Sequence, residues 1–370
     1  MKPLNPLLYI KNNFKSVMSI FFSMTLGVFL IYIFSLFSAT TTKMVSVASF
    51  DLMDKYNIAY VDNNTILPDQ FLRVLENNQN NSLAVQMNLS GLAYYRGGMG
   101  GTTMLTFNMF EEDTENLLDS FDMELVKGTL PQNDKNEILV PLEYALQNNL
   151  SVGDYIGTEV SDEYALQGKY IISGFIQGDV VFALSCQPGG QTKEDVLKRG
   201  IMYRVDNLSA VEQKALIDSL PDSVIILSHD YYEEEYSTIL TSMQALTYIF
   251  TIAMIVILCI ALGNLNIVLY SNRRDELKIL HSIGFTKGRL LKKLWIENLF
   301  VCIGGYIAGI IFTMLVVWLI NTYSLIPHGK ILELISAQGL ITAFTMPIFV
   351  SIFSLLPNII SKFKNENLCI

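Results

Sequence analysis

The chain alternates between long apolar stretches and polar ones. Four apolar stretches, residues 18–37, 243–270, 299–320 and 339–360, are each long enough to cross the ~30 Å core of a bilayer as a helix rising 1.5 Å per residue. The polar stretch of residues 38–242 separates the first from the other three. The pattern predicts a membrane protein with four transmembrane α-helices in a 1+3 order. Because its apolar core exceeds that of a signal peptide, we expect residues 18–37 to remain as an anchor.

Charge is distributed very unevenly between these parts. Residues 41–240 contain 12 Lys and Arg against 30 Asp and Glu, whereas the rest of the chain contains 13 against 5. Basic residues favour the cytoplasmic side of a membrane. The segments that carry the basic excess are 1–17, 271–298 and 361–370. We therefore expect both termini and the 271–298 loop in the cytoplasm, and the 38–242 domain and the short 321–338 loop outside.

The large polar domain shows a mixed pattern of strands and helices. Two β-α-β units are predicted, one at each end of the domain. The first comprises a strand at Asn57–Asp62, a helix from Pro68 to Glu76 and a strand at Leu83–Leu89; the second comprises a strand at Ile201–Val205, a helix at Ser209–Leu220 and a strand at Val224–Leu227. A β-rich stretch lies between them. The expected fold is an α+β domain in which a discontinuous β-α-β subdomain carries a β-rich insertion.

The cytoplasmic loop of residues 271–298 is patterned as two short helices. We expect a helix at Asp275–Ser282, a left-handed Gly284 that ends it, and a second helix from Thr286 onward. Its basic residues could serve only to set topology and contact lipid headgroups. Its apolar residues exceed that need, so a coupling element that contacts a cytoplasmic partner is the preferred interpretation. Glu297, at the mouth of the third span, should pair with a nearby Arg or Lys.

The sequence contains no recognisable catalytic motif. It contains no G-x-x-x-x-G-K-[ST] phosphate loop, so we expect a non-catalytic chain that does not bind nucleotide phosphates in this way. His229 lies beside acidic residues, but an Asp230-x-x-Glu233 helix cap explains them better than a metal site. The 97–101 stretch, Gly-Gly-Met-Gly-Gly, is interpreted as a flexible tip or, alternatively, a contact loop. Of the four cysteines only Cys186 lies in the domain outside, so no disulfide is expected there.

Two groups of motifs resemble the MacB/FtsX-like family of ABC-transporter permeases. In the outer domain the succession is Gly128-Thr-Leu-Pro131, Glu137 to Val140, Ala145, Val152-Gly-Asp154 and Tyr170-Ile-Ile-Ser-Gly174. In and after the cytoplasmic loop the matching residues are Arg273, Arg274, Glu276, Leu280, Ile283-Gly284, Glu297, Gly304, Gly305 and Gly309. The order of anchor, domain and three spans is also the family's. Phe285, where a small residue is common, and the glycine-rich 97–101 insertion depart from its pattern.

The resemblance implies a permease subunit in the bacterial plasma membrane. It would pair with a second permease copy as a homodimer or a related heterodimer. Cytoplasmic ATPases would dock on the loop, and their ATP-driven motion would pass through the spans to the outer domain. The transporter would export or extract a peptide, lipopeptide, lipoprotein or antibiotic. The residues implied in ATPase coupling are Arg273, Arg274, Glu276, Leu280, Ile283, Gly284, Phe285 and Arg289. No cofactor, metal or nucleic acid is implied. Alternatives are a mechanical regulator of a cell-wall hydrolase or sensor kinase, and a stand-alone receptor or adhesin.

The third span carries a small-residue motif of its own. Gly304, Gly305 and Gly309 allow another helix to approach closely. The sequence leaves open whether that helix belongs to the same chain or to a second copy.

Overall fold

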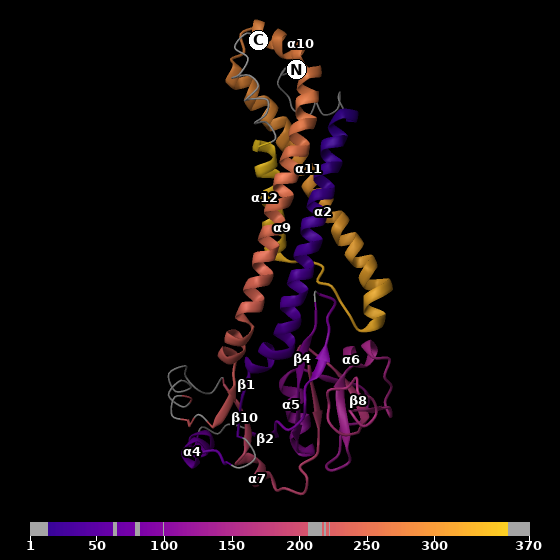
Figure 1. Ribbon diagram of the computed structural model, residues 1–370, viewed down its shortest axis with the longest axis vertical. Helices are drawn as coiled ribbons and strands as arrows, with labels where there is room; N and C mark the ends of the chain where they lie inside the picture. The colour runs from indigo at the N-terminus through magenta and orange to yellow at the C-terminus, as the bar shows by residue number, and fades with distance from the viewer. Residues whose placement is uncertain are drawn as a thin grey trace. The chain divides into compact units, whose positions relative to one another are not determined.

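The computed structural model describes residues 14–353 except 62–64, 78–81, 99, 206–216, 218–219 and 222. The chain divides into two compact units. The first, here called the span unit, comprises residues 1–39, 242–320 and 333–370; the second, the sheet unit, comprises 40–241 and 321–332. Figure 1 draws the elements of both.

The span unit is built from long apolar helices joined by one short polar helix. Its helices are α2 (Phe14–Val45), α9 (His229–Asn272), α10 (Arg274–Ser282), α11 (Lys287–Ile320) and α12 (Ala337–Phe353). Among the described residues, three stretches of helix are long and apolar enough to cross a membrane: Val17–Met53, His229–Val268 and Gly288–His328. The fourth predicted span falls on α12, but the end of that stretch lies outside the described residues.

Two of these helices extend beyond their apolar stretches. A π-helical turn, η1 (Ser46–Phe50), and a short α3 (Asp51–Met53) continue the helical course of α2. α9 begins before the predicted span, at His229, and runs without interruption to Asn272. Both helical courses thus include residues of the sheet unit as well as of the span unit.

The described part of the sheet unit contains eleven strands, with short helices between them. The strands are β1 (Tyr56–Val61), β2 (Leu83–Gln86), β3 (Leu92–Tyr94), β4 (Thr102–Met109), β5 (Glu124–Gly128), β6 (Glu137–Pro141), β7 (Tyr155–Ile156), β8 (Tyr170–Gln177), β9 (Phe182–Ser185), β10 (Gly200–Arg204) and β11 (Val224–Leu227). The helices are α4 (Asp69–Asn77), α5 (Glu111–Ser120), α6 (Leu142–Gln147) and α7 (Lys193–Leu197). The 321–332 segment adds η2 (Asn321–Leu325) and η3 (Ile326–His328).

The strands form a single mixed sheet in the order β11-β1-β10-β2-β4-β9-β6-β8-β5, with β3 on β4 and β7 on β8. β10 is antiparallel to both β1 and β2, and β1 is antiparallel to both β10 and β11. Each predicted β-α-β unit therefore encloses a strand of the other, a split β-α-β arrangement. β2 also pairs with β4, which joins these strands to the β-rich part of the chain.

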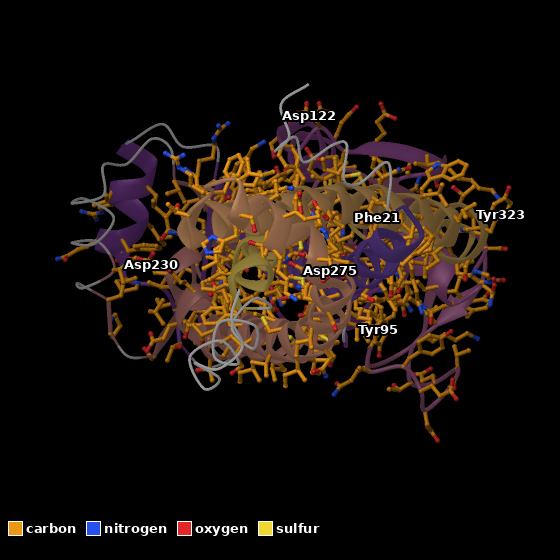
Figure 2. All side chains as sticks on the ribbon, turned by 90° about the horizontal axis from the view of Figure 1, so that it is seen from above. Phe21, Tyr95, Asp122, Asp230, Asp275 and Tyr323 are labelled. Atoms are coloured by element: carbon orange, nitrogen blue, oxygen red, sulfur yellow. The ribbon has the colours of Figure 1, made fainter. Side chains whose placement is uncertain are left out.

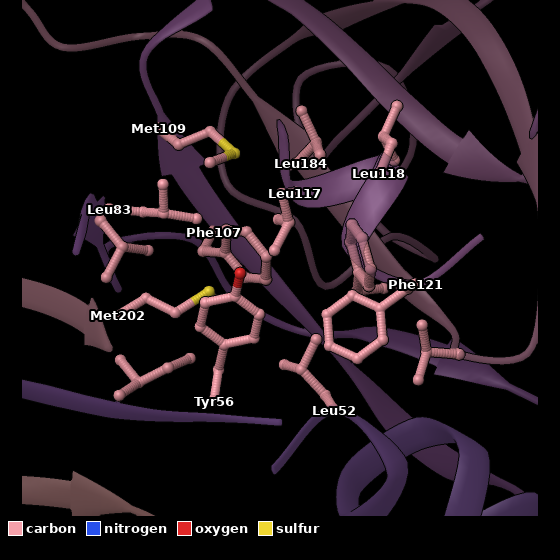
Figure 3. Close-up of a cluster of buried hydrophobic side chains, with 14 of the residues drawn as sticks. Leu52, Tyr56, Leu83, Phe107, Met109, Leu117, Leu118, Phe121, Leu184 and Met202 are labelled. Atoms are coloured by element: carbon pink, nitrogen blue, oxygen red, sulfur yellow. The ribbon is translucent and has the colours of Figure 1, made fainter. Parts of the chain in front are cut away.

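Three buried clusters pack on the strands of the described sheet. The largest gathers aromatic and aliphatic side chains from many elements, among them Tyr56, Phe107, Phe121 and Met202 (Figure 3). Phe107 and Phe182 stack with ring centroids 5.5 Å apart. These two residues come from β4 and β9, which pair in parallel although far apart in sequence. The core thus depends on non-local pairing.

One predicted helix start is wrong. The acidic pair Asp230 and Glu233 does not cap α9, because the helix already begins at His229. Ser228 precedes it, and its Oγ accepts a hydrogen bond from the Tyr231 backbone N–H at 3.2 Å. A short hydroxyl side chain placed just before the first helical residue satisfies an N-terminal donor better than a carboxylate already inside the helix. His229 instead pairs with Asp54, with 2.8 Å between Nδ1 and Oδ1.

Candidate functional site: the turn between α9 and α11

A sharp double bend joins α9 to α11, and its backbone is fixed at both corners. At the first corner Arg273 leaves the helical conformation, with φ −102° and ψ 8°. At the second, Gly284 has φ +99°, and its N–H bonds to the carbonyl of His281 at 3.0 Å. The Phe285 N–H bonds to the carbonyl of Leu280 at 3.2 Å. This pair of bonds is a Schellman motif, so Gly284 ends α10 as the sequence predicted.

Apolar side chains hold α10 against the start of α11. Leu277 packs with Leu290 and Leu294, and each of the three is at most 6% exposed. Leu280 and Phe285 pack against the edge of this cluster. A hydrophobic contact between the residues at these two positions commonly accompanies a Schellman motif. Leu280 and Phe285 therefore shape the turn from within, and Phe285 fits there although the family pattern favours a small residue.

Four charged side chains of the same turn form a network of ion pairs. The Arg273 guanidinium donates to both carboxylate oxygens of Glu276, at 2.9 and 3.1 Å, and to Oε2 of Glu297 at 2.8 Å. Lys293 Nζ lies 3.3 Å from Glu276 and 3.8 Å from Glu297. The Arg273, Lys293 and Glu297 side chains are 7%, 6% and 3% exposed. The network links the residue between α9 and α10, the first turn of α10, and the second and third turns of α11.

The electrostatic effects of the network follow from this geometry. The hydrogen bonds from Arg273 lower the pKa of Glu276 below its ordinary value, against the opposing effect of partial burial. For Arg273, burial alone would lower the pKa, but the hydrogen bonds to Glu276 and Glu297 outweigh it and raise the pKa. Both groups therefore stay charged at neutral pH. Two buried cations face two carboxylates, and this pairing offsets the desolvation cost of burying the charges.

The sequence anticipated part of this network. Glu297 was expected to pair with an Arg or Lys, and the structure pairs it with Arg273 and Lys293. The burial of Lys293 was missed, because its position among several basic residues suggested a solvated topology signal. Its spacing to Glu297, i to i+4 on one helix face, was the available signal.

The remaining predicted coupling residues face outward or are not described. Ile283 is 70% exposed and the neighbouring Ile279 is 61% exposed, while Arg289 is exposed on the first turn of α11. The side chain of Arg274 lies outside the described set. The structure thus divides the predicted site into an internal frame, made by Arg273, Glu276, Leu280, Gly284 and Phe285, and an outward surface. An exposed aliphatic pair on a framed helix is a surface suited to packing against a protein partner.

The predicted helix-packing glycines contact α2 of the same chain. A Cβ built on Gly305 would lie 2.8 Å from Cβ of Met24, and one on Gly309 would lie 2.8 Å from Cβ of Val28. The same construction on Gly304 finds Phe21 at 3.6 Å, an ordinary contact. Gly305 and Gly309 therefore let α11 approach α2 of the same chain closely.

Among the described residues, no three His, Cys, Asp or Glu side chains come together as a metal site. Cys186 and Cys302 are buried thiols and Cys259 is partly buried. Burial raises the pKa of Cys186 to about 11, so this thiol is neutral at physiological pH.

Comparison with known proteins finds a family model that matches the region containing this turn, and several solved structures with low similarity. Residues 248–361 match the family model described as FtsX-like permease C-terminal. No curated protein sequence matches the chain. Among solved structures, the periplasmic region of MacB from Actinobacillus actinomycetemcomitans matches with 12% identity and TM-score 0.28, covering 50% of this chain and 92% of that one. The extracellular domain of the noncanonic ABC-type transporter YknZ from Gram-positive bacteria matches with 10% identity and TM-score 0.27, covering 47% and 100%.

The family match includes the last part of α9, the turn, α11 and α12. It spans the residues on which the sequence motifs of the second group lie, from Arg273 to Gly309. The resemblance predicted from those motifs is therefore confirmed: residues 248–361 of this chain are similar to the C-terminal region of FtsX-like permeases.

Proposed function

We propose that the chain is the non-catalytic membrane subunit of an ABC transporter and that the α9–α11 turn receives motion from a cytoplasmic ATPase. The observation that carries the proposal is the pair Ile279 and Ile283, exposed at 61% and 70% on a helix whose other face is locked by apolar packing and ion pairs. A rigid helix that presents aliphatic side chains can pass force to its neighbours. The FtsX-like match supports the same role.

The relay beyond the turn uses α9. This helix is continuous from His229 to Asn272, so a displacement applied at Arg273 reaches the residues near Ser237 without a flexible break. Inserting Gly-Gly-Ser after Ser237 should uncouple the two ends, because glycine costs roughly 1 kcal/mol per residue in a helix and permits bending. Binding of the ATPase should persist in this variant while transport is lost. Retained transport would contradict a relay through α9.

The docking surface itself can be tested with charge. Ile283→Asp should abolish co-purification with the partner ATPase and lower the ATPase's stimulated hydrolysis at least tenfold, because a carboxylate in an apolar contact has no partner. Ser282→Asp, on the same turn of α10, places the same charge beside the surface and serves as the control. Equal, wild-type binding by both variants would rule out Ile283 as a contact.

Orientation is the simplest requirement of the proposal. In a cysteine-free background, Asn78→Cys should react with an impermeant thiol reagent on intact cells, and Lys287→Cys should not. Labelling of the Lys287→Cys variant would place the turn outside the cell and exclude contact with a cytoplasmic ATPase. The outcome depends on the charge distribution along the chain, not on the details of the turn.

The cargo is assigned only by class. A peptide, lipopeptide, lipoprotein or antibiotic captured by the sheet unit fits a subunit whose four apolar stretches contain no Asp, Glu, Lys or Arg that could line an ion path.

A further inference from the structure

The segment that joins α11 to α12 is closed on itself by one side chain. Asn321 Nδ2 donates to the carbonyl of Leu332 at 2.8 Å, and Asn321 Oδ1 accepts from the Leu332 N–H at 2.9 Å. Asn321 is 3% exposed and Leu332 is 2% exposed. Between them run the η2 and η3 turns and Gly329, which is left-handed with φ +64°. We call residues 321–332 the strap.

Helix α6 holds the middle of the strap. The Gln147 amide Nε2 donates to the carbonyl of Gly329 at 2.9 Å and to the carbonyl of Tyr95 at 2.6 Å. One side chain therefore bonds the strap and the turn after β3 together. A Cβ on Gly329 would lie 2.3 Å from the carbonyl oxygen of Glu143. Only glycine permits both this approach and this backbone conformation.

The turn between β3 and β4 holds the end of the strap. The Ile331 N–H donates to the carbonyl of Arg96 at 2.7 Å. A Cβ on Gly97 would lie 3.1 Å from the Ile331 carbonyl oxygen, and one on Gly98 would lie 2.3 Å from Thr41 Oγ1. Lys330 Nζ also lies 5.9 Å from the Tyr95 ring centroid. Gly97 and Gly98, which the sequence left as either a tip or a contact, thus make close contacts on both sides.

We propose that the strap is a fixed part of the sheet unit and acts as a third mechanical connection between this unit and the spans, beside α2 and α9. The contacts above all lie within the sheet unit, whereas the residues that follow Leu332 and precede Asn321 belong to the span unit. A strap held by backbone and amide hydrogen bonds transmits displacement of α11 and α12 instead of absorbing it as a slack loop would. This mechanical consequence rests on the proposed function; the docking itself does not.

Hydrogen exchange tests the docking on the purified full chain. Gln147→Ala removes both amide hydrogen bonds and should raise the exchange rate of the peptide covering Gly329–Leu332 roughly 10- to 30-fold. Asn148→Ala is the matched control, because the Asn148 side chain donates to the Tyr144 carbonyl of α6 and not to the strap. Fast exchange of this peptide in the wild-type chain, or equal exchange in the two variants, would overturn the proposal.

Lengthening the tether tests the mechanical role. Gly-Gly-Ser inserted after Glu333 leaves every docking contact in place but slackens the link to α12. In the complex with the ATPase, ATP should change the exchange of α6 and of the β3–β4 turn in the wild-type chain and fail to do so in the variant. An unchanged ATP response in the variant would overturn the third connection, and so would loss of strap protection there, since the docking would then depend on tension. No ATP response in the wild-type complex would instead count against the proposed function.

Discussion

The two turns that flank α11 are held in opposite ways. The turn before it, residues 273–285, is fixed by ion pairs among Arg273, Glu276, Lys293 and Glu297. The hydrogen bonds that fix the strap after it come from uncharged groups, the Asn321 and Gln147 amides and the backbone of Gly329 and Ile331. Removing one partner of a buried ion pair leaves an uncompensated charge, whereas losing a neutral hydrogen bond costs far less. The two turns should therefore differ in their sensitivity to charge, to pH and to single substitutions.

The largest effect should come from the ionic turn. Glu297→Ala leaves Arg273 and Lys293 buried with only Glu276 to balance them, and we expect a loss of about 3–5 kcal/mol in the free energy of unfolding. Thermal unfolding of the purified protein in detergent measures it. Asp275→Ala is the control, because the Asp275 side chain is 95% exposed on the same turn (Asp275 is labelled in Figure 2). Similar unfolding temperatures for both variants would show that the ion pairs do not stabilise the folded protein.

The next effect separates two left-handed glycines, one in each turn. A Cβ on Gly329 would collide with the Glu143 carbonyl oxygen at 2.3 Å, whereas a Cβ on Gly284 would have no atom within 4 Å. Gly329→Ala should cost about 2–4 kcal/mol through backbone strain and overpacking, and Gly284→Ala about 1–2 kcal/mol through backbone strain alone. Thermal unfolding under one set of conditions compares them. A greater loss for Gly284→Ala would mean that the strap moves aside at little cost.

Periodicity in the sequence predicted the elements of the fold well. β11 has the predicted bounds, Val224–Leu227, and β1 lies one residue from its predicted position. The helix at Ser209–Leu220 lies mostly outside the described residues. The pairing of β4 with β9 in one continuous sheet could not be predicted, because apolar alternation specifies which face is buried and not which strand is the neighbour.

The candidate site shows the same limit. Gly284 as a helix end and Glu297 as half of an ion pair follow from local signals, a glycine after a helical run and a carboxylate at the mouth of a span. The strap does not, because Gln147 and Gly329 are 182 residues apart and neither has a distinctive neighbourhood in the sequence. Its exposed residues, such as Tyr323 at 76% (labelled in Figure 2), gave it the pattern of an ordinary loop. Contacts made by backbone carbonyls do not require particular side chains, so the sequence does not reveal them.

An intermediate effect should appear in the packing of the spans. Gly305→Leu places a side chain where a Cβ alone would be 2.8 Å from Cβ of Met24, and overpacking should cost about 1–3 kcal/mol. Gly304→Leu is the control, since the first atoms that a Cβ there meets are those of Phe21 at 3.6 Å. Unfolding in detergent again gives the difference. If both variants unfold alike, α11 does not need a small residue at position 305.

The smallest expected effect is a pH dependence confined to the ionic turn. The hydrogen bonds from Arg273 lower the pKa of Glu276 from its ordinary 4.5 in the folded chain. Because the folded pKa is the lower one, the stabilisation is fully present above about pH 4.5 and is lost as the pH falls through the folded value. Hydrogen exchange of α10, corrected for its intrinsic pH dependence, should therefore be constant from pH 7 to 5 and rise below about pH 4.5. Exchange of the Gly329–Leu332 peptide should not change over this range, because the Gln147 and Asn321 amides do not titrate. Glu276→Gln should abolish the rise in α10. If the rise persists in that variant, another carboxylate causes it; if both turns loosen together, the distinction between an ionic and a neutral turn is wrong.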